Sequence, residues 1–200
     1  MGHGHLGAVL FTLVFAQGSA LGAAERWNAL VDGALEADGA LRLELVEASP
    51  GHMVVDLHLR GYWTEDVRVG ERSYTALSLG EGRIRRVGEP ALPLVSRFLA
   101  VALGSQADDL HVEVLSEERR LLPGLVVPPA QVSPKRCVGQ TPPRVVCNEA
   151  RYRGASSFPA AKVEIAGLGT MRDLRYAQLV LYPMRLEPAR GAVSVATHMR

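Results

Sequence analysis

The side chains with the clearest chemical potential lie between positions 135 and 153, where five cations occur within nineteen residues and Glu149 is the sole acid. A basic side chain on an exposed loop can enter an acidic pocket, as a protease substrate does, when a carboxylate pairs with it there. The simpler interpretation of this composition is an ordinary solvated loop. The five cations are Lys135, Arg136, Arg144, Arg151 and Arg153.

The only two cysteines of the chain lie inside this basic segment. Cys137 and Cys147 would close a ring of eleven residues that also contains Pro142 and Pro143. Two cysteines in an exported protein are expected to pair, and closing a ring of this size stabilises the folded chain by about 3 kcal/mol. A rigid basic loop loses less conformational entropy when it enters a pocket, which favours a binding role.

No catalytic motif accompanies the loop. The sequence contains no GxSxG, HExxH or CxxC, and no histidine cluster lies near either thiol, so neither a nucleophile with its base nor a zinc site is indicated. His58 and His111 fall on the polar side of alternating segments, where solvated positions are the ordinary explanation. We therefore expect no catalytic site, no metal and no cofactor in this chain.

The composition is that of a globular protein, with 48% apolar and 22% charged residues in a chain of 200. The net charge of +1 gives no basis for nucleic acid or an anionic membrane as a bulk partner. Any recognition through charge must therefore be local.

The first residues predict a secretory signal peptide. An apolar run over residues 6–16 is followed by small residues, so we expect residues 1–23 to be removed by cleavage after Ala20, Gly22 or Ala23. Eleven residues are too few to span a bilayer, which takes about 20. The alternative is a buried N-terminal helix.

Residues 40–200 show the periodicity of β-strands. Period-2 alternation marks strands with one buried and one solvated face, and the turn spacing predicts a single all-β domain, an antiparallel sandwich or jelly roll. Phe98–Leu103 is apolar at every position, as in a strand covered on both faces. The alternating runs are 41–45, 53–60, 110–114 and 161–165, further strands are expected at 176–182 and 193–197, and turns are expected at 49–51, 80–82, 104–105, 123–124 and 167–169.

Three further segments complete this organisation. Residues 24–39 are expected to form a tether or a short helix, because Trp27 and Leu30 would share a helical face. Residues 117–120, with the sequence EERR, are expected to be a solvated strand end. Residues 128–157 form one long irregular excursion, and loops of this length are commonly functional.

Three motifs follow one another in the second half of the chain: G-x-P-x-L-P over 88–93 with Ser96-Arg97, then Tyr152 with Phe158-Pro159, then M-R-D-x-R over 171–175 with Pro183, Pro188 and Gly191. In their order and spacing, the chain resembles the propeptides of gingipain-type secreted bacterial cysteine peptidases. The similarity runs from about Leu41 to Arg200 and is strongest from Gly88 onward. The cysteine pair is not part of the family pattern, and Leu186-Glu187 replaces an aromatic-Asn pair that often precedes the second proline.

The resemblance implies a β-sandwich that assists folding and export of a cysteine protease and inhibits it until the two are cleaved apart. In the family, the inhibitory basic residue follows an apolar-Pro stretch. Here that stretch is Val126-Val127-Pro128, so the matching residue is Arg136, with Lys135 adjacent and Arg144 in the same loop. The implied partner is a gingipain-type protease domain, in cis or in trans, because this sequence contains no protease domain.

The alternative function is a secreted β-sandwich module for adhesion or carbohydrate binding. Such sites display exposed aromatic residues, and Tyr62, Trp63 and Tyr74 are the candidates, although core packing explains them equally well. In both interpretations we expect a monomer that is secreted, periplasmic or on the cell surface, with no membrane span and no nucleic acid partner.

Overall fold

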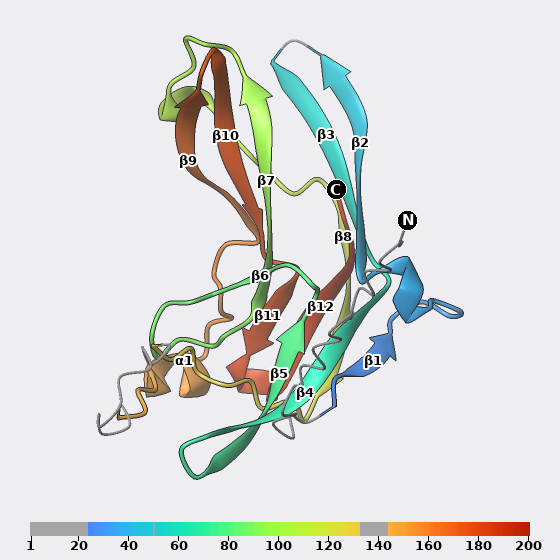
Figure 1. Ribbon diagram of the computed structural model, residues 1–200, viewed down its shortest axis with the longest axis vertical. Helices are drawn as coiled ribbons and strands as arrows, with labels where there is room; N and C mark the ends of the chain where they lie inside the picture. The colour runs from blue at the N-terminus through green and yellow to red at the C-terminus, as the bar shows by residue number, and fades with distance from the viewer. Residues whose placement is uncertain (1–23, 50, 133–143) are drawn as a thin grey trace, which may run out of the picture.

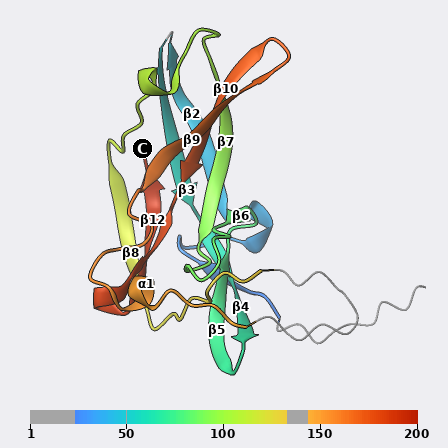
Figure 2. The ribbon, with the colours of Figure 1, turned by 90° about the vertical axis from the view of Figure 1, so that its left-hand side faces the viewer.

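The protein, described here by a computed structural model over residues 24–49, 51–132 and 144–200, folds into three antiparallel β-sheets. The predicted all-β, sandwich-like architecture is therefore confirmed (Figures 1 and 2). No helix in these three ranges is long and apolar enough to cross a membrane. The strands are β1 (Arg26–Ala29), β2 (Leu41–Ser49), β3 (His52–Leu59), β4 (Gly61–Val69), β5 (Arg72–Ser78), β6 (Gly82–Arg83), β7 (Pro93–Val101), β8 (Glu117–Pro123), β9 (Val163–Met171), β10 (Leu174–Leu181), β11 (Met184–Glu187) and β12 (Ala192–Met199).

The sheets have the strand orders β1-β4-β5, β6-β7-β10-β9 and β11-β12-β3-β2, and β8 pairs with the free side of β12. One α-helix, α1 (Glu149–Arg153), and three 3-10 turns, η1 (Glu36–Asp38), η2 (Ala107–Asp109) and η3 (Pro188–Arg190), complete the described elements. In Figure 1, β9, β10 and β7 form the upper left layer, and β3 and β2 form the upper right layer.

The chain passes directly from one sheet to another at two bends. Arg60 separates β3 from β4, and its backbone exchanges hydrogen bonds with Leu30 and Ala40. Tyr182-Pro183 separates β10 from β11, and the Pro183 ring is fully buried. Strands that bend from one sheet into the next join the layers covalently, so the sheets share one core.

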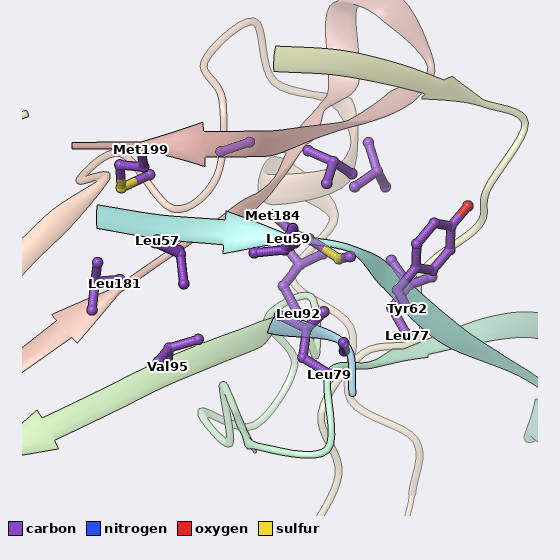
Figure 3. Packing of buried hydrophobic residues seen from close by; sticks show 14 of the residues in the cluster. Leu57, Leu59, Tyr62, Leu77, Leu79, Leu92, Val95, Leu181, Met184 and Met199 are labelled. Carbon is purple, nitrogen blue, oxygen red and sulfur yellow. The ribbon is translucent and has the colours of Figure 1, made fainter. Parts of the chain in front are cut away.

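The core lies between the layers (Figure 3). Leu57 and Leu59 of β3 face Val95 of β7 and Leu181 of β10, and all four side chains are nearly or completely buried. Each such aliphatic side chain stabilises the fold by about 1.5–3 kcal/mol through burial. The prediction that residues 53–60 form a strand with one buried face is therefore confirmed. Asp56 and His58 lie on the outer face of the sheet.

Of the two alternatives for residues 24–39, a tether or a short helix, the helix is wrong, because residues 26–29 form strand β1 beside β4. The Trp27 ring lies 4.9 Å from the Trp63 ring and covers Gly61, where a Cβ atom would come within 2.2 Å of it. Tertiary packing of this kind routinely overrides a helical pattern in a short segment.

Two strand predictions near the upper layers also need correction. Phe98 is 66% exposed, so β7 is not covered on both faces at this point, and its ring instead packs edge-on against Tyr176 at 4.9 Å. Residues 110–114 form no strand and instead line the cleft between the layers. Alternating polar and apolar residues indicate a segment with two different faces. A segment that covers a cleft can show this pattern without pairing as a strand.

The glycines at 167 and 169 do not make the expected turn, because both lie inside β9. The Tyr176 side chain of the neighbouring β10 lies over Gly169, where a Cβ atom would come within 2.4 Å of its phenol ring. A glycine inside a strand often marks such a close approach. The turn is made instead by residues 172–173, between β9 and β10.

The charge run at residues 117–120 begins strand β8 and exposes Glu118 and Arg120 as expected, but Glu117 and Arg119 are not solvated. The side chains of Glu117 and Arg119 are only 18% and 19% exposed and are joined at 2.9 Å, and Lys162 also donates a hydrogen bond to Glu117. Arg119 further donates a hydrogen bond to Ser194 of β12 at 2.8 Å. Burial opposes ionisation of Glu117, but the hydrogen bonds from Lys162 and Arg119 outweigh it and lower the pKa of this carboxyl below its ordinary value.

Glu117 should therefore contribute to stability in a pH-dependent manner. A lowered pKa in the folded state means that the contribution is complete above the unfolded-state pKa and is lost as the pH falls through the folded-state pKa. We expect Glu117→Gln to lower the free energy of unfolding at pH 7 by about 1–3 kcal/mol and to flatten its fall below pH 5, as measured by urea unfolding. Glu44→Gln, which breaks a more exposed pair with Arg42, should cost less than about 1 kcal/mol. Equal effects of the two substitutions at pH 7 would contradict this role of Glu117.

Candidate functional site

The basic excursion is described at its two ends. Lys135, Arg136 and Cys137 lie outside the described residues, whereas residues 128–132 and 144–157 are placed. We call these two placed ends, together with residues 86–91, the loop base. Its geometry determines how the sequence between the two ends is held.

The N-terminal end of the loop pairs with the first family motif. The Gly88 amide donates a hydrogen bond to the Ala130 carbonyl at 2.8 Å, and the Ala130 amide donates to the Glu89 carbonyl at the same distance. The Ala91 amide donates to the Pro128 carbonyl at 2.9 Å. These bonds form a short antiparallel bridge in which the G-x-P-x-L-P segment is the fixed partner.

The C-terminal end of the loop binds the same segment. The Asn148 amide donates a hydrogen bond to the Gly88 carbonyl at 2.8 Å. Gln131 joins the two ends directly, because its side-chain amide donates to the Val146 carbonyl at 2.7 Å and accepts from the Val146 amide at 3.0 Å. The loop therefore leaves and re-enters the domain at one hydrogen-bonded point.

A buried carboxylate lies within the loop base. The Glu89 side chain is 8% exposed, and its oxygens lie 3.4 Å from Arg86 and 3.7 Å from the Arg151 guanidinium. A buried charge is tolerated only when it is paired, so Glu89 holds Arg151 against the domain. Arg151 therefore contributes to the loop base and is less available to a partner than its sequence position suggests.

The second family motif fixes α1 and the residues after it. Tyr152 packs against the core, and burial raises the pKa of its phenol well above the ordinary value. The Phe158 backbone exchanges two hydrogen bonds with Leu186 of β11, at 2.9 and 2.7 Å, and the Arg151 guanidinium lies 5.2 Å from the centre of the Phe158 ring. The Pro159 carbonyl accepts a hydrogen bond from Arg185. Tyr152, Phe158 and Pro159 therefore attach α1 and the residues after it to the rest of the domain.

The remaining cations of the excursion differ in their surroundings. Arg153 is 77% exposed and pairs with Glu149 within α1 at 3.1 Å. Arg144 is exposed and makes no ion pair with any residue that the structure places. Of the predicted site residues, Arg144 and Cys147 can be located, and both belong to the loop base.

Cys147, two residues before α1, is half-buried. Burial raises the pKa of its thiol, and the neighbouring Glu149 carboxylate adds to this effect. A thiol with a raised pKa is a poor nucleophile at neutral pH, so the surroundings of Cys147 are not those of a catalytic cysteine. Its pairing with Cys137 stays a prediction, because Cys137 lies outside the placed ranges.

The fold and the loop base define a class of protein: an all-β sandwich that holds both ends of one long loop on a short, buried motif. A family model described as Propeptide_C25 matches residues 48–200. The chain belongs to this propeptide family, and the resemblance to gingipain-type propeptides that the motifs predicted is confirmed.

Two solved structures share the fold. The complex of the Porphyromonas gingivalis RgpB pro- and mature domains has a chain with a TM-score of 0.67 and 21% identity, covering 78% of this chain and 81% of that chain. A structure that concerns the zymogenic latency of gingipain K from Porphyromonas gingivalis gives a TM-score of 0.65 and 19% identity, covering 90% of this chain and 97% of that chain. No curated protein sequence matches this chain.

Two members of the loop base were missed from the sequence. Gln131 and Glu89 carry no motif of their own, and their partners Val146 and Arg151 are distant in the chain. The sequence contains only an indirect signal for Glu89. An acidic residue inside an otherwise apolar motif, Gly88-Glu89-Pro90, indicates a buried carboxylate that needs a cation.

The disulfide prediction can be tested by counting thiols in the unfolded chain. We expect alkylation in denaturant without reductant to modify neither Cys137 nor Cys147, and alkylation after reduction to modify both. Denaturant is necessary because the raised pKa of Cys147 would slow its labelling in the folded protein even if it were free. Modification of two thiols per chain before reduction, measured by mass spectrometry of freshly exported protein, would show that the ring does not form.

Proposed function

We propose that this propeptide keeps a gingipain-type cysteine protease inactive by inserting the basic loop into its active site, and that it also assists the folding and export of that protease. Arg136 is the residue that enters the specificity pocket, with Lys135 as the second candidate and Arg144 as a flanking cation. The observation that carries the proposal is the loop base, where the first family motif holds both ends of the loop.

Pre-organisation is the first physical support. Each immobilised side chain or loop residue costs conformational entropy when it binds, and a loop that is already held at both ends loses less of it. The Gly88, Ala130 and Asn148 backbone bonds provide this hold. A ring closed by Cys137 and Cys147 would extend the constraint toward Arg136.

An apolar surface around the loop base is the second support. Several valines in or next to the base are between 41% and 60% exposed. Exposed apolar residues that gather beside a functional loop mark a docking surface for another protein. A protease domain seated on this surface would receive the loop at the same time. The valines are Val87, Val126, Val132, Val145 and Val146.

The distribution of charge is the third support. Glu89 and Glu149 pair with Arg151 and Arg153, and these pairs stay within the domain. Arg144 is exposed, and the sequence contains no acidic residue between Lys135 and Arg144. The sequence from Lys135 to Arg144 therefore contains three basic residues and no acidic one, which suits an acidic specificity pocket.

The adhesion or carbohydrate-binding alternative has less support. Tyr62 and Tyr74 are 7% and 8% exposed and belong to the protein interior. Trp63 packs against Trp27 and donates a hydrogen bond to Glu36 at 2.9 Å. These three aromatic residues were the candidates for a sugar-binding surface, and packing within the domain explains each of them.

We expect Arg136→Ala to weaken inhibition of a gingipain-type protease by the isolated domain tenfold or more. Truncating one partner of a buried, hydrogen-bonded charge pair costs about 2–5 kcal/mol, and each factor of ten corresponds to about 1.4 kcal/mol. The inhibition constant is measured against the protease with a peptide substrate. Lys135→Ala should have the smaller effect, and neither substitution should change the thermal stability of the domain.

The matched control is Arg153→Ala, which removes an exposed arginine of the same excursion that pairs only with Glu149. Arg119 is unsuitable as a control, because it is part-buried and bonded to Glu117 and Ser194. If Arg136→Ala and Lys135→Ala inhibit as well as the parent domain, the loop does not enter the active site. If the parent domain binds no such protease, the adhesion function becomes the better proposal.

A further inference from the structure

Three potential metal ligands meet on the outer face of the β11-β12-β3-β2 sheet, away from the loop base. Asp56 and His58 belong to β3, and His198 belongs to β12, where it is the direct cross-strand partner of His58. The two imidazole rings are stacked with their centres 4.7 Å apart and their planes inclined by 24°. One ligand atom from each of the three residues lies within 4.8 Å of the other two.

Two atoms of this cluster are buried without a hydrogen bond. Asp56 Oδ1 and His198 Nε2 are both inaccessible to solvent, and neither finds a hydrogen-bond partner among the placed residues. His198 Nε2 lies 3.7 Å from Asp56 Oδ2, which is too far for a hydrogen bond. Buried polar atoms are almost always hydrogen-bonded in folded proteins, so two such atoms without a hydrogen bond at one place point to a further ligand, although Arg200 Nε lies 3.5 Å from Asp56 Oδ1.

The spacing of these atoms is close to that of ligands around a single ion. Zinc binds imidazole nitrogen and carboxylate oxygen at about 2.0–2.2 Å, so two of its ligands in a tetrahedral site lie about 3.3–3.6 Å from each other. The 3.7 Å between His198 Nε2 and Asp56 Oδ2 is slightly longer than this, and side-chain rotation would bring the three ligand atoms, which now lie within 4.8 Å of one another, to this separation. We propose that Asp56, His58 and His198 bind a divalent transition metal ion of the zinc type.

The charges that face the cluster are compatible with such an ion. Arg42 and Glu44 of β2 lie opposite His58 and Asp56 and pair with each other. Glu118 of β8 lies opposite His198 and is exposed, so it can supply a fourth ligand. Arg200 Nε lies 3.5 Å from Asp56 Oδ1 and is 41% exposed, so it can turn into solvent when a cation occupies the site.

The place of the cluster gives the ion a structural role. β12 and β3 pair through only two residue pairs, His198 with His58 and Met199 with Leu57, whereas β12 pairs with β8 along its whole length. A metal ion held by both strands would join the sheet where few backbone hydrogen bonds do so. An ion that binds only the folded state stabilises it in proportion to its free concentration and affinity.

The test is the change in thermal unfolding temperature caused by zinc chloride, together with the zinc dissociation constant from calorimetry. The parent for this test is the full chain with His3→Gln and His5→Gln, so that the N-terminal histidines do not bind the ion. We expect one zinc ion per chain and a rise in Tm of about 5 °C or more when free zinc exceeds Kd about a hundredfold. His58→Ala and Asp56→Asn should each weaken zinc binding at least tenfold and remove most of the rise.

The matched controls are His52→Ala and His111→Ala, because both histidines are exposed and lie outside the cluster. Their zinc binding and Tm shift should equal those of the parent. His58 is itself exposed, so His58→Ala should fold without metal, which circular dichroism verifies. A parent that gains no stability from zinc, or a His58→Ala variant that binds zinc as tightly as the parent, would overturn the proposal.

Discussion

The short backbone segment at residues 88–91 is the constraint on which the rest of the functional surface depends. Its hydrogen bonds hold Pro128 and Ala130 on one side and Asn148 on the other, so both ends of the basic loop are fixed by the same few residues. Gly88 has a φ of +84°, and a Cβ atom there would lie 3.1 Å from the Val146 side chain and 3.3 Å from the Asn148 amide nitrogen. Both the backbone conformation and the close approach require glycine at this position.

The segment can hold the loop because the core holds the segment. Pro90, Leu92 and Pro93 are fully buried, and β7 continues directly from Pro93 into the β6-β7-β10-β9 sheet. The Glu89 carboxylate extends the same anchor to Arg151 and through it to α1. The buried core therefore fixes the segment at residues 88–91, and this segment in turn fixes the ends of the loop.

The sequence predicted the fold where a local pattern and the tertiary structure agree. The alternation of Leu57 and Leu59 with His58 placed β3 and its buried face correctly, and the order of the motifs led to the propeptide family. The errors arose where packing between distant segments decides the outcome. Trp27 over Gly61 makes a strand where helical spacing was expected, and Tyr176 over Gly169 explains a glycine that resembled a turn signal.

The candidate site, like the fold, was predicted from the sequence only in part. The cations and cysteines of the loop are visible in the sequence, but their partners are not. Glu89 with Arg151, Gln131 with Val146, and the cluster of Asp56 with two histidines all join residues that are distant in the sequence and that only the tertiary fold brings together. Glu117 and Arg119 of the charge run were misread for this reason, because Glu117 pairs with Lys162 and Arg119 donates a hydrogen bond to Ser194 of β12.

Gln131→Ala tests most directly the claim that the loop base orders the loop for inhibition. The substitution removes the hydrogen bonds between Gln131 and Val146 and leaves every basic residue in place. Because each such bond contributes about 0.5–1.5 kcal/mol, we expect the inhibition constant against a gingipain-type protease to rise about tenfold with little change in Tm. Gln106→Ala, which removes a glutamine from the turn after β7, should leave the inhibition constant unchanged. Equal inhibition by Gln131→Ala and the parent domain would contradict the claim.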